Sequence, residues 1–381
     1  AMRRPAQVGE EIDRARTITF TLVGNARVAS PGDTIASALA AAGVSVLSRS
    51  FKYHRPRGLL CCAGHCPNCL VQVGPEPSVR ACTRAVEPGM VVSSQNAWPS
   101  LNRDVMSLTG LASRFLPAGF YYKAFIHPQS MWPAYEKFLR NAAGLGKIDA
   151  DTPPGEYDKQ YLHTDLAVVG AGPAGLGAAR AAAEQGLRVL LVDENPALGG
   201  HLRYAPPRHR DTLAHLVGAI HADERITVLT SATIISAFEE NWLAAVAQKE
   251  NGARLYKIRA EAVVYATGAY EQPLLFDNND LPGIMLGSAA QRLVHLYGVP
   301  PGRRAVVVTA NEDGWGVAAD LVAAGIEVAA IADLRASPHA AAARPQGLDG
   351  VPVYWAHAPI SATGSQRVRN ITLAPLDSAG A

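Results

Sequence analysis

Runs of apolar residues broken by glycine dominate the middle of the chain. Residues Asp165–Val169 form a short apolar run, Ala174–Gln185 carries small apolar residues at helical spacing, and Arg188–Asp193 is largely apolar again. Short apolar runs bounded by turn residues predict buried strands, whereas the longer periodic segment predicts a helix. Residues 164–200 are therefore expected to fold as strand, tight turn, helix and strand.

The same order of elements recurs near the end of the chain. Ala305–Thr309 and Glu327–Ala332 are apolar runs, and Val317–Ala324 between them has a helical pattern. A strand–helix–strand repeat of this kind predicts parallel strands joined by a crossover helix. Two such units indicate an α/β architecture.

The segments between and after these repeats predict one further helix and several strands. We expect a helix over Asp211–Ala222, meander strands over Ile226–Leu229, Ala232–Phe238 and Leu243–Val246, a buried strand over Ala262–Ala266, and strands over Val351–Trp355 and Val368–Leu373.

The N-terminal part has a different pattern. Residues Thr17–Val28 alternate between apolar and polar around Gly24-Asn25, which predicts a β-hairpin. A turn at Ser30–Thr34 leads into a helix of small residues over Ile35–Ala42, which Gly43 stops. A hairpin followed by a helix indicates a β-grasp, the ferredoxin-like way of building a small domain.

Residues 98–154 are rich in aromatic side chains and are interrupted by prolines. One apolar helical face is expected here and should pack against another surface. That surface belongs to the large domain, to the substrate or to another subunit. Residues 149–160, rich in Asp, Pro and Gly, are expected to form a linker. The residues of the apolar face are Trp132, Tyr135, Leu139 and Ala142.

Composition predicts a large core. Apolar residues make up 48% of the 381 residues and charged residues 18%, with a net charge of +2. Domains of roughly 100 to 200 residues would give two or three in a chain of this length. Basic residues are scattered apart from the short cluster Lys52–Arg57, so nucleic acid is not an expected partner. No apolar run reaches about 18 residues, so we expect no membrane span and a cytoplasmic protein.

The turn within residues 164–200 carries the pattern Gly170-x-Gly172-x-x-Gly175. In dinucleotide-binding folds the first glycine makes the turn, the second admits the pyrophosphate and the third lets the helix approach the strand. Pro173 and Ala174 open the helix, whose N-terminus favours an anion. We expect a dinucleotide here rather than a glycine-rich turn with only a structural role.

Two acids follow the second strand. Asp193 ends it, and Glu194, nineteen positions after Gly175, is expected to accept hydrogen bonds from ribose hydroxyls. The later pair Gly199-Gly200 favours FAD as the ligand, and NAD is the alternative. Other residues expected to line this site are Asn195, Gly199, Gly200, His201, Thr267 and Gly268.

All five cysteines fall within residues 61–82, spaced Cys61-x4-Cys66-x2-Cys69-x12-Cys82, with Cys62 as the fifth. This clustering of an odd number argues against a disulfide framework. The spacing matches the plant-type 2Fe-2S pattern, so Cys61, Cys66, Cys69 and Cys82 are the expected cluster ligands, the last from a neighbouring strand. Structural zinc is the competing interpretation, and Cys62 is expected to be a spare buried thiol.

The second repeat lacks the glycine pattern. Its turn reads Ala310-Asn311-Glu312-Asp313, and two acids beside a pyrophosphate would repel it. We therefore expect this second nucleotide fold to be intact but not to bind NAD(P)H.

Several stretches resemble known families. CCAGHCPNC and RACTRAVEPGMVV resemble the ferredoxin-like domain of molybdenum hydroxylases. SQNAWPSLNRDV, FLPAGFYYKAF and MWPAYEKFLRNAAGLG are similar to the α subunit of heterotetrameric sarcosine oxidase and its amine and imino-acid dehydrogenase relatives, of proline and opine type. The resemblance covers essentially the whole chain. It implies a multi-subunit flavoenzyme that oxidises a secondary or N-methyl amine or an imino acid. The best-known α subunits have lost the cluster cysteines, and their retention here points to the dehydrogenase relatives.

The resemblance also implies partners. A flavoprotein β subunit would carry the substrate site, further small subunits would complete the complex, and FMN would lie between two subunits. This chain would be the electron-transfer and dinucleotide-binding α subunit, with no catalytic base assigned to it. Two other functions stay open: an NAD(P)H-dependent reductase that feeds an oxygenase, and a non-catalytic scaffold.

The expected fold is α/β, with a two-dinucleotide-domain plan like that of glutathione reductase. A ferredoxin-like domain is expected over residues 1–97, an aromatic helical connector and linker over 98–160, a Rossmann domain for FAD or NAD over 161–300, and a degenerate Rossmann-like domain over 301–381. The chain stops before the strand that would close the first fold, so we expect a truncated domain or a sheet completed by a partner.

Overall fold

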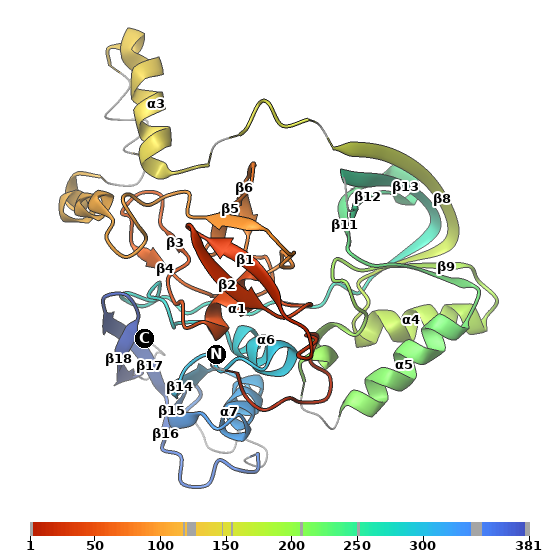
Figure 1. The fold of residues 1–381 in the computed structure, drawn as a ribbon. Coiled ribbons are helices and arrows are strands. Elements are labelled where there is room, and N and C mark those ends of the chain that lie inside the picture. Colours follow the sequence, from red (N-terminus) through yellow and green to blue (C-terminus); the bar gives the residue numbers. More distant parts are fainter. Residues whose placement is uncertain are drawn as a thin grey trace. The chain divides into compact units, whose positions relative to one another are not determined.

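The computed structural model describes residues 3–116, 119, 127–146, 148–153, 155–205, 209–249, 252–336 and 345–377. The chain forms two compact units, which are described separately (Figure 1). The first unit joins Ala1–Ala150 to Glu271–Ala381, and the second is Asp151–Tyr270. The division into four domains by sequence stays a prediction.

The N-terminal part of the first unit is a β-grasp, as predicted. Helix α1 (Ile35–Ala41) begins with a capping box in which Thr34 and Ser37 exchange side-chain hydrogen bonds with each other's backbone N–H groups. The helix packs its apolar face on a core that includes Phe20 and Val92. The sheet has the order β2-β1-β7-β5-β6. Its strands are β1 (Ile18–Leu22), β2 (Asn25–Ala29), β5 (Leu70–Val73), β6 (Glu76–Arg80) and β7 (Val91–Ser93), and the short strands β3 (Ser48–Arg49) and β4 (Pro56–Arg57) pair separately.

The first hairpin turns one residue earlier than expected. Leu22 pairs with Asn25, so the two-residue loop is Val23-Gly24, and both of these residues have positive φ (48° and 75°). Such a loop matches the twist of the flanking strands. The prediction missed the register because a β-branched residue is rare at positive φ.

The connector contains η1 (Val105–Phe115), η2 (Gln129–Met131) and α3 (Trp132–Ala143). None of the residues of α3, all of which the structure describes, is buried. The expected apolar face is therefore only half-covered within the described chain. The aromatic residues at positions 120–126 lie outside the described residues.

The rest of the first unit contains the second repeat. Helix α6 (Gly287–Tyr297) packs on α7 (Asp313–Ala323) through Ala290 and Val294. Strands β14 (Arg304–Thr309), β15 (Glu327–Asp333) and β16 (Val353–Trp355) form a parallel sheet. A hairpin of β17 (His357–Gly364) and β18 (Val368–Pro375) follows. Strand β17 was not predicted. Pro359, Thr363 and Gly364 lie within it and obscure the alternation of apolar and polar residues.

The second unit is the first nucleotide fold. Its six-stranded sheet has the order β10-β9-β8-β13-β12-β11. Helices α4 (Pro173–Glu184) and α5 (Arg210–Ala222) pack through Leu176 and Ile220 on one core. The strands are β8 (Glu156–Val169), β9 (Val189–Val192), β10 (Ile226–Leu229), β11 (Ala232–Phe238), β12 (Trp242–Lys249) and β13 (Gly252–Tyr265), with the short η3 (Gly200–Arg203) and η5 (Glu239–Asn241) between them.

Three predictions about this unit were wrong. The segment Ala262–Ala266, expected to be a buried strand, overlaps the end of β13, and none of its residues is buried. Strand β10 pairs in parallel with β9 as the third strand of the nucleotide fold, so it is not part of the meander. Strand β8 begins at Glu156, inside the expected linker, because residues 156–164 pair with β13 along its whole first half. The chain crosses between the units twice, at Ala150–Asp151 and at Tyr270–Glu271.

Candidate functional site

The glycine turn lies between β8 and α4. Gly170 has φ of +98°, and a Cβ here would collide with the carbonyl of Ala266. A Cβ at Gly175 would collide with the carbonyl of Gly170. The fold itself therefore requires these two glycines. Gly172 differs, because its Cβ would meet no atom of the described chain closer than the Gly200 Cα at 4.0 Å. The described part of the fold therefore does not itself require a glycine at position 172.

A second glycine segment faces this turn. Gly199 N donates a hydrogen bond to the Ala171 carbonyl at 2.8 Å, and a Cβ at Gly200 would lie 2.8 Å from the Gly172 Cα. The two bare backbone segments therefore lie against each other at the N-terminus of α4. Such an arrangement suits a pyrophosphate, because the first N–H groups of a helix have no partner within the helix and favour an anion. His201 follows Gly200 in η3 and is exposed.

The segment after β13 lies on the other side of the turn. Ala266 N donates to the Val169 carbonyl at 2.8 Å, and the Thr267 Cα would lie 3.2 Å from a Cβ at Gly170. Thr267 thus lies against the glycine turn, and the approach of Thr267 and Gly268 to a cofactor stays a prediction.

The two acids after β9 have different environments. Asp193 is buried, and its carboxylate accepts hydrogen bonds from Ala171 N at 2.6 Å, from Asn195 N at 2.8 Å and from Asn195 Nδ2 at 2.9 Å. Its oxygens hold the glycine turn in place. Glu194 is exposed at the same edge. Asp193 is therefore a positioning residue, and the binding of a ribose by Glu194 stays a prediction.

Replacing Asp193 with Asn should loosen this turn. The amide would direct N–H groups at one of two backbone donors, and an unpaired buried donor costs roughly 1–3 kcal/mol. We expect a lower unfolding midpoint together with less retained dinucleotide, measured by mass after release. Glu194→Gln is the control, because it should weaken nucleotide retention without changing the midpoint of the nucleotide-free chain. An Asp193→Asn protein with unchanged midpoint and content would contradict this role.

The four cysteines expected to bind the cluster lie together in the β-grasp. Cys61, Cys69 and Cys82 are buried and Cys66 is half-buried, and all are free thiols. Thiol contacts join Cys61 to Cys66, Cys69 to Cys82, and Cys61 to Cys82. Two of these contacts define the pairs Cys61–Cys66 and Cys69–Cys82, and the third joins one pair to the other. Two pairs of thiols suit two irons that each bind two thiolates. Within the described residues, no three His, Cys, Asp or Glu side chains are grouped as a single metal ion requires.

These contacts shift the pKa values of the thiols. Hydrogen bonds from Cys66 and then Cys82 lower the pKa of Cys61, and one from Cys82 lowers the pKa of Cys69. The same contacts raise the pKa of Cys66 and of Cys82. One member of each pair therefore favours the thiolate, the form that binds metal.

Two details differ from expectation. Cys82 lies in the turn after β6 rather than in a strand, so the ligand comes from the end of the neighbouring strand. Cys62 is half-buried and has positive φ of 48°. It packs against an apolar group that includes Ala41 and Leu293, and burial raises the pKa of its thiol. Its role as a spare thiol stays a prediction.

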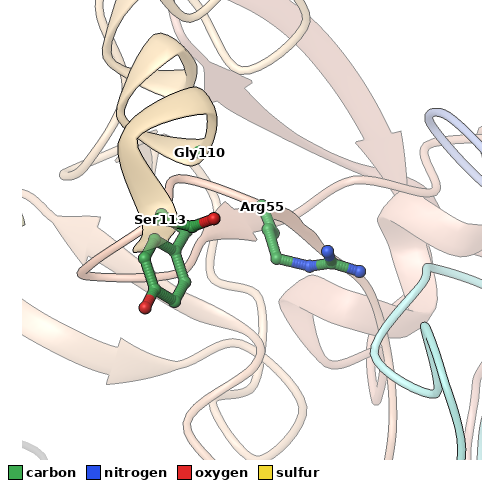
Figure 2. A pocket seen from close by; sticks show the side chains of 4 residues that line it. Arg55, Gly110 and Ser113 are labelled. Carbon is green, nitrogen blue, oxygen red and sulfur yellow. The ribbon is translucent and has the colours of Figure 1, made fainter. Parts of the chain in front are cut away.

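A cavity of about 400 Å³ lies near the basic cluster and is lined by Tyr53, Arg55, Gly110 and Ser113. Figure 2 shows that the guanidinium of Arg55 points away from Gly110 and Ser113. It donates instead to both carboxylate oxygens of Asp280, at 2.6 and 2.7 Å, and Arg57 also binds Asp280. Arg55 and Arg57 therefore join the β-grasp to the segment before α6.

Sequence inspection missed a buried pair beside the connector. His54 Nδ1 lies 2.7 Å from Asp104 Oδ2, and His54 Nε2 lies 2.7 Å from the Ala142 carbonyl at the end of α3. A carbonyl can only accept, so Nε2 carries a hydrogen. Both ring nitrogens are used, which makes His54 a structural link between the loop and α3. Nothing in the sequence pattern marks a histidine 50 residues from its acid.

The fold and the two sites define a class of protein. Residues 15–97 match the family of 2Fe-2S iron-sulfur cluster binding domains, and residues 164–336 match the pyridine nucleotide-disulphide oxidoreductase family. The chain therefore joins a 2Fe-2S cluster binding domain to a dinucleotide-binding domain of the pyridine nucleotide-disulphide oxidoreductase type. The family match confirms the predicted 2Fe-2S cluster over zinc.

Comparison with individual proteins makes this assignment more specific. The chain is 41% identical over 348 residues to the sarcosine oxidase subunit alpha of Rhizobium meliloti (strain 1021), covering 85% of the chain and 35% of the relative. It is 35% identical over 353 residues to that of Corynebacterium sp. (strain P-1), covering 88% and 32%. The chain is thus a homologue of sarcosine oxidase α subunits, as its sequence indicated, and spans about a third of their length.

A solved structure confirms the fold. L-proline dehydrogenase from P. horikoshii superposes with a TM-score of 0.63 at 20% identity, over 96% of this chain and 58% of that one. Among the helices that the structure describes, none is both long and apolar enough to cross a bilayer.

Proposed function

We propose that this chain is the electron-transfer and dinucleotide-binding part of a multi-subunit, flavin-dependent oxidoreductase. Its substrate would be a secondary or N-methyl amine or an imino acid, oxidised at the CH–NH bond. The observation that carries this proposal is the presence, in one chain, of four thiols arranged as two pairs and a glycine turn with open space at Gly172. The names of its relatives, sarcosine oxidase subunit alpha, support the substrate class.

The pairing of cofactors supports an electron-exit role. A flavin accepts two electrons together, whereas a 2Fe-2S cluster carries one at a time. The residues of this chain would hold the cluster in a buried loop, which excludes water, and orient the dinucleotide on the N-terminus of α4. FAD is the proposed dinucleotide and NAD the alternative. Glu194, exposed beside the turn, would bind the ribose of either one.

A partner would perform the oxidation. His54, buried next to the connector, has both ring nitrogens engaged, so it is not available as a base. The substrate site would lie in a flavoprotein β subunit, with FMN between two subunits and small subunits completing the complex. The exposed apolar side chains Leu108, Leu111 and Phe138 in the connector support such a contact.

Anaerobic reduction of the assembled complex tests this proposal. Sarcosine or proline should bleach first the flavin absorption and then the cluster absorption, with a reduced-cluster signal in electron paramagnetic resonance. The complex built with Cys66→Ala should still reduce its substrate flavin but show no cluster signal. A wild-type cluster that stays oxidised beside a fully reduced flavin would reject the electron-exit role and favour a scaffold.

A further inference from the structure

The second strand–helix–strand unit has a turn of the same length as the first. Three residues, Gly170-Ala171-Gly172, separate β8 from α4, and three residues, Ala310-Asn311-Glu312, separate β14 from α7. In the second turn, side chains stand where the first has bare backbone. The fold still requires a glycine at Gly314, because a Cβ there would collide with the side chain of Thr309. Helix–strand packing is retained, and the open space is lost.

The acid at the end of β15 is already bound by the protein. Asp333 is fully buried. Arg335 donates to it from Nε at 2.9 Å and from Nη2 at 2.6 Å, and the indole Nε1 of Trp315 donates at 2.9 Å. Burial alone would raise the pKa of Asp333, but the hydrogen bonds from Arg335 and Trp315 outweigh it and lower the pKa. The carboxylate is thus charged and has its hydrogen bonds made.

The same arginine reaches the turn after β14. Its Nη1 donates to Glu312 Oε1 at 2.6 Å. Arg335 therefore bridges the carboxyl ends of β14 and β15. In nucleotide folds, the ligand crosses from the glycine turn to the acid of the second strand at this edge.

We propose that Glu312, Trp315, Asp333 and Arg335 form an internal clasp that takes the place of a ligand and excludes pyridine nucleotides from the second fold. One chain then holds one dinucleotide, at the Gly170–Gly175 turn. This inference is independent of the proposed amine substrate. It also removes the entry site that an NAD(P)H-dependent reductase of this plan would need.

The charge of this segment also disfavours binding of NADP(H) at the second fold. An arginine near the end of the second strand can hold the 2′-phosphate of NADP. Here the guanidinium faces two carboxylates, Asp333 and Glu312, and Asp313 adds a third at the start of α7. The local charge of about −2 repels a phosphate in this position.

The second strand–helix–strand unit and the helix before it also support the β-grasp that carries the cysteines. Helix α6 packs on α7 with one face, while Leu293 on it packs against the group that contains Cys62. Leu286 N, just before the helix, donates to the Leu60 carbonyl at 2.9 Å. The loop that carries Cys61 is thus fastened to the second repeat.

Nucleotide titration of the full chain tests the clasp. In a Gly172→Ala background, which weakens the first site, NADH and NADPH should show no saturable binding that depends on Arg335 up to about 1 mM, the upper end of ordinary KM values. Tryptophan fluorescence and equilibrium dialysis measure the binding of each nucleotide. Saturable binding of one equivalent that falls at least tenfold in Arg335→Ala would overturn the proposal.

Hydrogen exchange gives a readout that needs no variant. Residues 310–335 of the wild-type chain should exchange at the same rate with and without NADPH, because the clasp is complete without it. Protection of this segment by NADPH would also overturn the proposal. The released nucleotide should amount to at most one per chain.

Discussion

Replacing Cys66 with Ala is expected to abolish cluster binding. The wild-type chain should contain about two irons and two inorganic sulfides with visible absorption, and the variant should contain almost none of either. Cys66 contacts Cys61 and completes one of the two thiol pairs, so its loss leaves one iron with a single thiolate. Iron and sulfide analysis with an absorption spectrum measures this effect.

Cys66 is the most suitable ligand for this test. Cys69 and Cys82 belong to the buried core of the β-grasp, and changing them would also open a cavity. Cys66 is only half-buried, so the same substitution removes a ligand with little loss of packing. A remaining fall in the unfolding midpoint would then report how much the bound cluster stabilises the domain.

Cys62→Ala is the matched control. Cys62 is also half-buried, lies four positions away and undergoes the same chemical change. It packs against Ala41 and Leu293, so a small loss of stability is expected while iron content stays at the wild-type value. Loss of iron in Cys62→Ala with retention in Cys66→Ala would reverse the ligand assignment. A wild-type chain with one zinc and no visible absorption would refute the cluster altogether.

Local motifs predicted a 2Fe-2S domain and a dinucleotide fold, because the geometry of both motifs depends on neighbouring residues. A glycine turn between a strand and a helix fixes its own backbone, and three cysteines within nine positions must share one loop. The structure accordingly brings Gly170, Gly199 and Thr267 together.

Long-range pairing limited the prediction of the fold. Residues 156–164 read EYDKQYLHT, polar and largely exposed, so their sequence contains no strand signal. They are extended because β13 pairs with them residue by residue. Tertiary context overrides weak local preference in such strands.

The sequence also could not show which of two neighbouring acids binds the protein backbone and which is exposed. Asp193 and Glu194 both follow β9, and only the structure shows that the backbone N–H groups of Ala171 and Asn195 occupy the first. In the second repeat, the sequence suggested repulsion by Glu312 and Asp313. The structure adds the buried Asp333 and its arginine, two residues apart, which no glycine pattern would reveal.

Replacing Gly172 with Ala is expected to release the dinucleotide without unfolding the chain. Gly172 has φ of −73°, which alanine adopts freely, and its Cβ would meet nothing in the described chain nearer than 4.0 Å. The methyl group would instead occupy the path of the pyrophosphate. We expect binding at least tenfold weaker, or about 1.4 kcal/mol, with an unchanged unfolding midpoint in the nucleotide-free state.

Gly177→Ala supplies the control within the same helix. Gly177 is exposed on α4, and a Cβ there has no atom of the described residues within 4 Å. Alanine in a helix interior is more stable than glycine by roughly 0.5–1 kcal/mol, so this variant should unfold later and retain its dinucleotide. The two substitutions add the same methyl group five positions apart, and only the one at Gly172 faces the expected ligand. Equal nucleotide content in both variants would mean that the turn is structural, because the space at Gly172 would then serve no bound molecule.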